Sequence, residues 1–323
     1  MSKTVNFRAL AIVLLAGTIP SLIAQEGDYQ KGLSYYKQGQ YQKTIEEFEK
    51  IVETNPDYES GHRILGDSYL KIKAYDKAIE AFQKALELKG DNYVTHYGLA
   101  LSFFNEGRYR EAIATLDQGE DYARSPRDQY QIYRTRGSAY YNMNDFERAT
   151  SDLQKAVSIQ RGNASDALQL GIAYYRLGNY LEAEKYLQQA RVLDPQASGA
   201  KRYLSRLQFQ GAIEAIEAKN YTQAVALLDE YVKENPEDGE ARFNLGLAQL
   251  FAQNLDAAER EFLKCVELIP RNWEVYDRLG YLYERKQQYD KALQNYRTAH
   301  DLHQDPQIQK SVDRLQERIR RSQ

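Results

Sequence analysis

The chain of 323 residues is short of several residue types, and each shortage narrows its possible functions. It has a single cysteine, which excludes an internal disulfide bond. Its formal net charge is −3, and nucleic-acid-binding proteins usually carry a marked basic excess, so we expect no nucleic-acid partner. Proline occurs only seven times. Apolar residues make up 42% and charged residues 28%, which is the composition of a folding, soluble chain.

Sequence patterns that carry chemistry are also missing. There is no phosphate-binding loop, no G-x-S-x-G, no H-E-x-x-H and no C-x-x-C. His300 and His303 have a spacing that could hold a metal, but no third ligand is evident, so we interpret them as a solvated helix end. Cys265 stands where small residues pack, and we expect it to be a buried thiol. We therefore predict a protein that is not an enzyme and that has no cofactor and no metal site.

Only one apolar run is prominent, at residues 9–24. Lys3 and Arg8 precede it and polar residues follow, which is the layout of a secretory signal with Ala24 as the last residue removed. We expect residues 1–24 to be cleaved and the protein to be exported, periplasmic or secreted. The alternative is an uncleaved run that associates the protein with a membrane, although Gly17 and Pro20 interrupt a run already short for a spanning helix.

What the sequence has in abundance is repetition. The segment LGIAYYRLGNYLEAEKYLQQARVLDP at 170–195 closely matches LGDSYLKIKAYDKAIEAFQKALELKG at 65–90. With 34 residues per unit, eight units start at 25, 59, 93, 130, 164, 205, 239 and 273. Position 8 of the unit is always Gly or Ala, and position 20 is Ala in every unit except the first, which has Thr44. Position 24 is always a large apolar or aromatic residue.

This pattern predicts pairs of antiparallel helices. In KTIEEFEKIV at 43–52, apolar residues recur every three or four positions, as on one face of a helix. Small residues at positions 8 and 20 would let two helices approach closely. Gly39, Gly107 and Gly178 stand between the helices, where a left-handed residue is wanted. Because one helix pair cannot bury its own apolar face, the units must stack on one another.

The repeated unit resembles the tetratricopeptide repeat. The residues that carry the resemblance are the L-G-x-x-Y of the first helix, as in Leu170, Gly171 and Tyr174, and the A-x-x-x-F of the second, as in Ala78 and Phe82. The resemblance covers residues 25–306. It implies an all-α fold, a right-handed superhelical solenoid of antiparallel helix pairs.

Two breaks in the spacing divide the repeats. We assign repeats 1–3 to residues 25–126, repeats 4–5 to 130–197 and repeats 6–8 to 205–306. Seven added residues before the sixth unit predict an extended first helix at 200–216. Residues 307–323 predict a C-terminal capping helix, which a solenoid end requires.

The resemblance also implies where a partner would bind, on the concave surface lined by the first helices. Large apolar residues at positions 5, 9 and 12 of the units give the predicted partner-binding groove. Its members are Tyr36, Tyr97, Leu101, Phe104, Tyr141, Leu168, Ile172, Tyr175, Phe209, Ile213, Phe243, Leu247 and Tyr281. Exposed aromatic and aliphatic groups of this kind mark binding sites. The alternative for each residue is that it only packs against the adjacent repeat.

Some members of the family hold the C-terminal carboxylate of a chaperone tail with a Lys/Asn/Arg clamp. The corresponding positions here include Tyr29, Leu33, Ile64 and Val94, so we do not expect such a tail as partner. We predict a non-catalytic scaffold or adaptor that binds a protein or peptide with apolar anchors, within a cell-envelope or secretion assembly. The alternative is a membrane-tethered subunit of an enzymatic complex, for example one that makes surface polysaccharide.

Overall fold

The computed structural model describes residues 28–196 and 198–322, so the predicted signal at residues 1–24 lies outside the described residues. The described residues form helices and turns, with no strand among them. Residues 28–37 are helical. The helices that follow are α2 (Tyr41–Thr54), α3 (Glu59–Lys71), α4 (Tyr75–Leu88), α5 (Tyr93–Asn105), α6 (Tyr109–Glu120), α7 (Pro126–Asn142), α8 (Phe146–Ile159), α9 (Ala164–Arg176) and α10 (Tyr180–Leu193). After them come α11 (Ser198–Glu217), α12 (Tyr221–Glu234), α13 (Gly239–Phe251), α14 (Leu255–Leu268), α15 (Trp273–Arg285), α16 (Tyr289–Leu302) and α17 (Pro306–Ser322).

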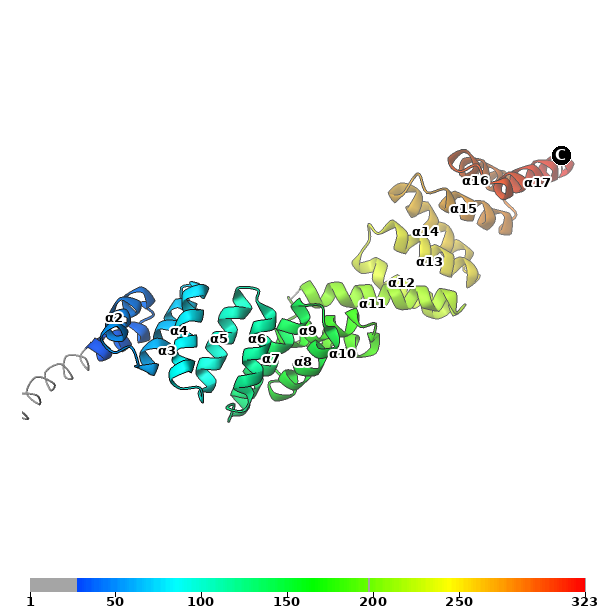
Figure 1. The fold of residues 1–323 in the computed structure, drawn as a ribbon. Helices are drawn as coiled ribbons and strands as arrows, with labels where there is room; N and C mark the ends of the chain where they lie inside the picture. Colours follow the sequence, from blue (N-terminus) through cyan, green and yellow to red (C-terminus); the bar gives the residue numbers. More distant parts are fainter. Residues whose placement is uncertain (1–27, 197, 323) are drawn as a thin grey trace, which may run out of the picture. The chain divides into compact units, whose positions relative to one another are not determined.

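Consecutive helices pack as the pairs that the repeat predicts, and each pair packs on the next one among α2–α10 and among α11–α16 (Figure 1). The residue at position 8 of a first helix faces the large residue at position 24 of its partner helix. A Cβ atom built on Gly246 would lie 2.6 Å from Cε1 of Phe262, and one on Gly171 would lie 2.8 Å from Cγ of Leu187. Glycine at these positions therefore lets the large side chain lie directly on the backbone of the first helix.

The turn within each pair has a fixed backbone conformation. Gly39, Gly107 and Gly178 have φ values of +70°, +82° and +75°, which confirms the predicted left-handed residues. The other five repeats place a non-glycine residue there with the same conformation. These residues are Lys73, Asn144, Lys219, Gln253 and Gln287, with φ between +57° and +68°. The left-handed turn is thus a property of the repeat, and glycine is the residue that adopts it with the least strain.

The chain divides into two compact units between Pro195 and Gln196, just before the second break in the spacing at residues 198–204. Each unit has its own buried cores. Unit 1 is built around side chains such as Phe48, Phe82 and Leu153, and unit 2 around side chains such as Leu228 and Phe262. The first break in the spacing does not divide the chain.

Both breaks lengthen a first helix. The helix α7 begins at Pro126 and is capped by Ser125, whose side chain accepts a hydrogen bond from the backbone N–H of Asp128. The carboxylate of Asp128 accepts one from the backbone N–H of Ser125 in return, which completes a capping box. The helix α11 spans 20 residues and confirms the predicted extension.

The C-terminal helix α17 packs on α16 as predicted. It buries Ile308, Val312 and Leu315, which are 4%, 5% and 0% exposed, while its charged residues face outward. The fold class expected from the sequence, an all-α solenoid of helix pairs with a C-terminal capping helix, is therefore confirmed. Among the described residues, no helix is long and apolar enough to cross a membrane.

Candidate partner-binding surface

The thirteen residues predicted to bind a partner all lie on first helices, eight in unit 1 and five in unit 2. Twelve are half-buried and one, Tyr281, is exposed. None is fully buried, so each could offer part of its side chain to a partner. Their role in binding stays a prediction.

The aromatic residues at position 12 also pack within their own repeat. The ring of Tyr36 lies edge-on to Tyr41 with centroids 5.8 Å apart, and Phe104 lies edge-on to Tyr109 at 5.4 Å. In the next repeats Tyr141 contacts Phe146 at 5.6 Å and Tyr175 contacts Tyr180 at 5.7 Å. In each case the partner is the first residue of the second helix, so the residue helps to close the helix pair.

In unit 2 two of the predicted residues pack into the cores. The ring of Phe209 lies 5.2 Å from that of Tyr231, and Phe243 lies 5.9 Å from the buried Phe262. Leu247 packs against the same cluster as Phe243. For these three residues, packing against neighbouring helices explains an apolar side chain without a partner.

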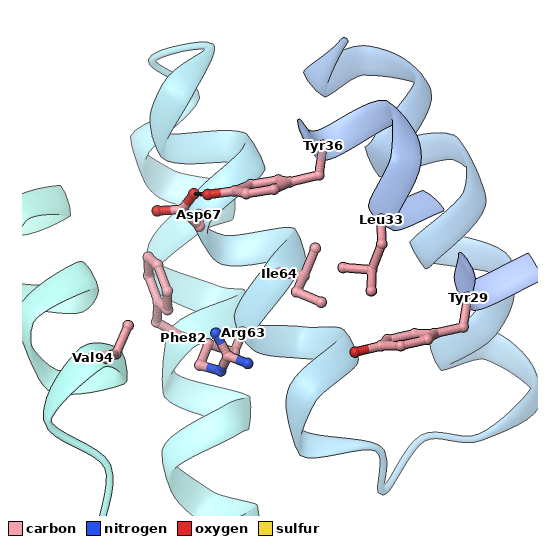
Figure 2. A pocket seen from close by; sticks show the side chains of 8 residues that line it. All are labelled: Tyr29, Leu33, Tyr36, Arg63, Ile64, Asp67, Phe82 and Val94. Carbon is pink, nitrogen blue, oxygen red and sulfur yellow. Dashed lines mark hydrogen bonds between the residues drawn. The ribbon is translucent and has the colours of Figure 1, made fainter. Parts of the chain in front are cut away.

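Unit 1 holds a pocket of about 230 Å³ between the first helices of repeats 1, 2 and 3 (Figure 2). Its lining residues are Tyr29, Leu33, Tyr36, Arg63, Ile64, Asp67, Phe82 and Val94. Of the thirteen predicted residues it contains only Tyr36. An engineered cavity of about 150 Å³ with apolar walls can hold a benzene molecule, so this pocket has room for an aromatic or branched side chain.

The walls of the pocket are mostly apolar. Figure 2 shows Tyr29, Leu33 and Tyr36 on one helix, with Leu33 facing Ile64. Val94, at the start of α5, is 55% exposed. Tyr29, Leu33, Ile64 and Val94 are the residues that stand at the carboxylate-clamp positions of the family, and here they form an apolar wall.

Two charged residues complete the pocket. The hydroxyl of Tyr36 donates a hydrogen bond to the carboxylate of Asp67, and burial together with this bond raises the pKa of Tyr36. The Nε atom of Arg63 lies 3.6 Å from the carboxylate of Glu59. Arg63 and Asp67 are not among the thirteen predicted residues, which are all apolar or aromatic. Their positions, 5 and 9 of the second repeat, were the signal that could have identified them.

Further along unit 1 the first-helix surface becomes polar. Asp166 is 1% exposed and accepts hydrogen bonds from the Tyr130 hydroxyl at 2.6 Å and the Arg134 Nε atom at 2.7 Å. Burial and the bond to Asp166 raise the pKa of Tyr130 to about 12, so the hydroxyl keeps its proton at neutral pH. Arg134 and Ser138 thus interrupt the apolar side chains between repeats 3 and 5.

Residues considered for chemistry have structural roles. Cys265 is fully buried, which confirms the expected buried thiol, and burial raises the pKa of this thiol to about 12. The ring of His303 stacks on Trp273 with centroids 4.6 Å apart. Within the described part of the chain, no group of three or more His, Cys, Asp or Glu residues could hold a metal ion.

Comparison with known proteins places this architecture in a family. Sequence models of the tetratricopeptide repeat match residues 29–93, 69–133, 130–163, 165–197, 209–272 and 261–294. The chain is 26% identical to Hsp70-Hsp90 organizing protein 3 of Arabidopsis thaliana over 219 residues, 65% of this chain and 36% of that protein. It is 22% identical to human DnaJ homolog subfamily C member 3 over 230 residues, 68% of this chain and 45% of that protein. It thus spans less than half the length of these relatives.

Similar solved structures include MamA, with a TM-score of 0.48 and 23% identity over 52% of this chain and 96% of that chain. Another is the tetratricopeptide repeat domain of P58(IPK), with a TM-score of 0.35 and 16% identity over 93% of this chain and 99% of that chain. The matched sequence segments together span most of the described residues and fall within the run of helices from residue 28 to α16. This chain therefore belongs to the tetratricopeptide repeat family.

Proposed function

We propose that this protein is a non-catalytic scaffold that binds a segment of a partner protein, with the pocket of repeats 1–3 as its main anchor site. Members of the tetratricopeptide repeat family act as protein-interaction scaffolds. The observation that carries the more specific proposal is the pocket itself, a partly apolar hollow that opens beside an exposed valine. A preformed surface of this kind binds without the cost of ordering itself.

The chemistry of the pocket favours an apolar side chain over a C-terminal carboxylate. A carboxylate binds well where Lys, Arg or Asn side chains converge on it. Here Arg63 is the one basic residue among the lining side chains, and Glu59 and Asp67 lie near it. The apolar wall of Tyr29, Leu33 and Ile64 would instead exclude water around an aromatic or aliphatic anchor.

A site-specific cross-linking experiment tests this proposal. A photoreactive residue in place of Val94 should capture a partner segment in intact host cells, and the same residue in place of Leu263 should not. Leu263 is the matched control because it is similarly exposed, at 46%, but lies on a second helix of unit 2.

The captured segment, made as a free peptide, then identifies the anchor. We expect binding to be lost when its apolar side chain is changed to Ala, and to be unchanged when its C-terminal carboxylate is amidated. Loss of binding only on amidation would reveal a carboxylate clamp and contradict the proposal. Capture from position 263 with none from position 94 would place the site elsewhere.

We further propose that the protein works outside the cytoplasm, in a cell-envelope or secretion assembly. The signal-like residues 1–24 support this proposal. N-terminal sequencing of the protein from its host provides the test. Gln25 as the first residue would exclude the membrane-tethered alternative, and an intact N-terminus would favour it.

A further inference from the structure

The second helix of repeat 5, α10, has an unusual outer face. Leu181 and Val192, its second and thirteenth residues, are 79% and 78% exposed. No other repeat has an apolar residue at either of these two positions. The residues there are Gln42 and Glu53, Asp76 and Glu87, Arg110 and Asp121, Glu147 and Ser158, Thr222 and Lys233, Asp256 and Glu267, and Asp290 and Asp301.

Leu181 and Val192 lie on one line along the helix. At about 100° per residue, Leu181, Lys185, Gln188 and Val192 form a single stripe. The buried residues Ala183, Leu187 and Ala190 project in the opposite direction, toward the core. The stripe therefore takes no part in packing within its repeat. We call these four residues the α10 stripe.

We propose that the α10 stripe is a self-association surface, and that its occupant is the α10 helix of a second copy of this chain. The stripe is self-complementary when two copies pair in antiparallel orientation about a two-fold axis between Tyr186 and Leu187. Leu181 of each copy then contacts Val192 of the other copy. Such reciprocal contacts are what a two-fold interface requires.

The charges beside the stripe fit the same arrangement. Glu184 and Arg191 lie seven residues apart on one flank of the stripe. A two-fold axis perpendicular to the plane that contains both helices places the same flank of each copy on the same side of the contact. Glu184 of each copy then lies near Arg191 of the other copy. Lys185, near the centre, already has an ion pair with Glu182 at 2.8 Å, which limits its repulsion of the second Lys185.

The contact is small. Two helices that meet along one stripe bury less than the roughly 1,200 Å² of a standard stable interface. We therefore expect a weak and reversible dimer. Because the stripe lies on a second helix, pairing leaves the pocket on the first helices of repeats 1–3 open.

Analytical ultracentrifugation of the purified full chain over a range of concentrations tests the dimer. We expect a monomer–dimer equilibrium that is lost in the double variant Leu181→Glu, Val192→Glu. The matched control is Ser158→Glu, Thr222→Glu, which adds the same two charges at the equivalent exposed positions of repeats 4 and 6 and should still dimerise. A wild-type chain that stays monomeric overturns the proposal, and so does a dimer that survives the stripe variant.

Disulfide cross-linking tests the orientation. When chains carrying Leu181→Cys are mixed with chains carrying Val192→Cys, oxidation should join one chain of each kind. Cross-linking of Leu181→Cys chains to one another, without the mixed product, would contradict the antiparallel arrangement. The native Cys265 is fully buried and should give little background in either experiment.

Discussion

At the scale of single residues, close packing inside each repeat depends on one small residue. Gly246 illustrates this dependence, since any Cβ atom there would overlap the ring of the buried Phe262. Gly211 occupies position 7 of the sixth repeat, whereas Gly246 occupies position 8 of the seventh. A Cβ atom added to Gly211 would have Cδ1 of Leu227 as its nearest neighbour, at an ordinary contact distance of 3.7 Å. Two helical glycines of the same unit thus have opposite roles.

The substitutions Gly246→Ala and Gly211→Ala should change stability in opposite directions. We expect Gly246→Ala to lower the free energy of unfolding by about 1–3 kcal/mol, because overpacking forces the helices apart. Gly211→Ala should raise it by about 0.5–1 kcal/mol, because alanine loses less conformational freedom in a helix. Urea denaturation followed by circular dichroism measures both values. Equal stability of the two variants would contradict the packing model.

At the scale of helices, an ion-pair network around the buried Arg136 and Asp152 joins three helices where the first spacing break occurs. Arg136 of α7 is 8% exposed, and its guanidinium contacts Asp152 of α8 and both Asp117 and Glu120 of α6, each at 2.6 Å. Burial acts to raise the pKa of Glu120, but the hydrogen bond and the charge attraction of Arg136, together with Tyr133 and Lys155, lower it. The network therefore links the end of repeat 3 to both helices of repeat 4.

Removing the arginine should be costly. We expect Arg136→Met to destabilise unit 1 by about 3 kcal/mol, because it leaves the buried carboxylate of Asp152 with only Lys155, at 3.6 Å. Adding Asp152→Asn should recover part of the loss. The control Arg148→Met removes a pair whose arginine side chain is 63% exposed, and it should cost less than about 1 kcal/mol. Similar losses from both arginines in thermal or urea denaturation would show that the network adds nothing.

At the scale of the whole molecule, the two compact units should unfold as separate cooperative transitions, because each has its own buried cores. The single tryptophan, Trp273, lies in unit 2, so its fluorescence reports on that unit alone, whereas circular dichroism reports on both. Gly246→Ala should lower the fluorescence midpoint and move only part of the circular dichroism transition. One shared transition that moves as a whole would show that the units unfold together.

Much of the fold could be predicted from the sequence because the repeat encodes local geometry many times over. A small residue followed sixteen positions later by a large one, as in Gly171 and Leu187, recurs in every unit. The helix pair predicted for one unit is therefore supported by the same pattern in the other seven. Helix ends were equally predictable, since Pro56 and Pro236 cannot continue a helix that precedes them. For Lys73 and Gln287 the residue type alone does not predict the left-handed conformation, and only their alignment with Gly39, Gly107 and Gly178 indicates it.

The sequence by itself determined the helix pairs, their number and their order, because each depends on contacts between residues close in the chain. Only the tertiary structure decided which first-helix residues are available to a partner, because availability depends on which other helices pack against them. The apolar side chains of Tyr141 and Phe209 predict contact with a partner, yet both pack against helices of their own repeat. The charge of Asp67 gives no such prediction, yet folding places this residue in the wall of the pocket.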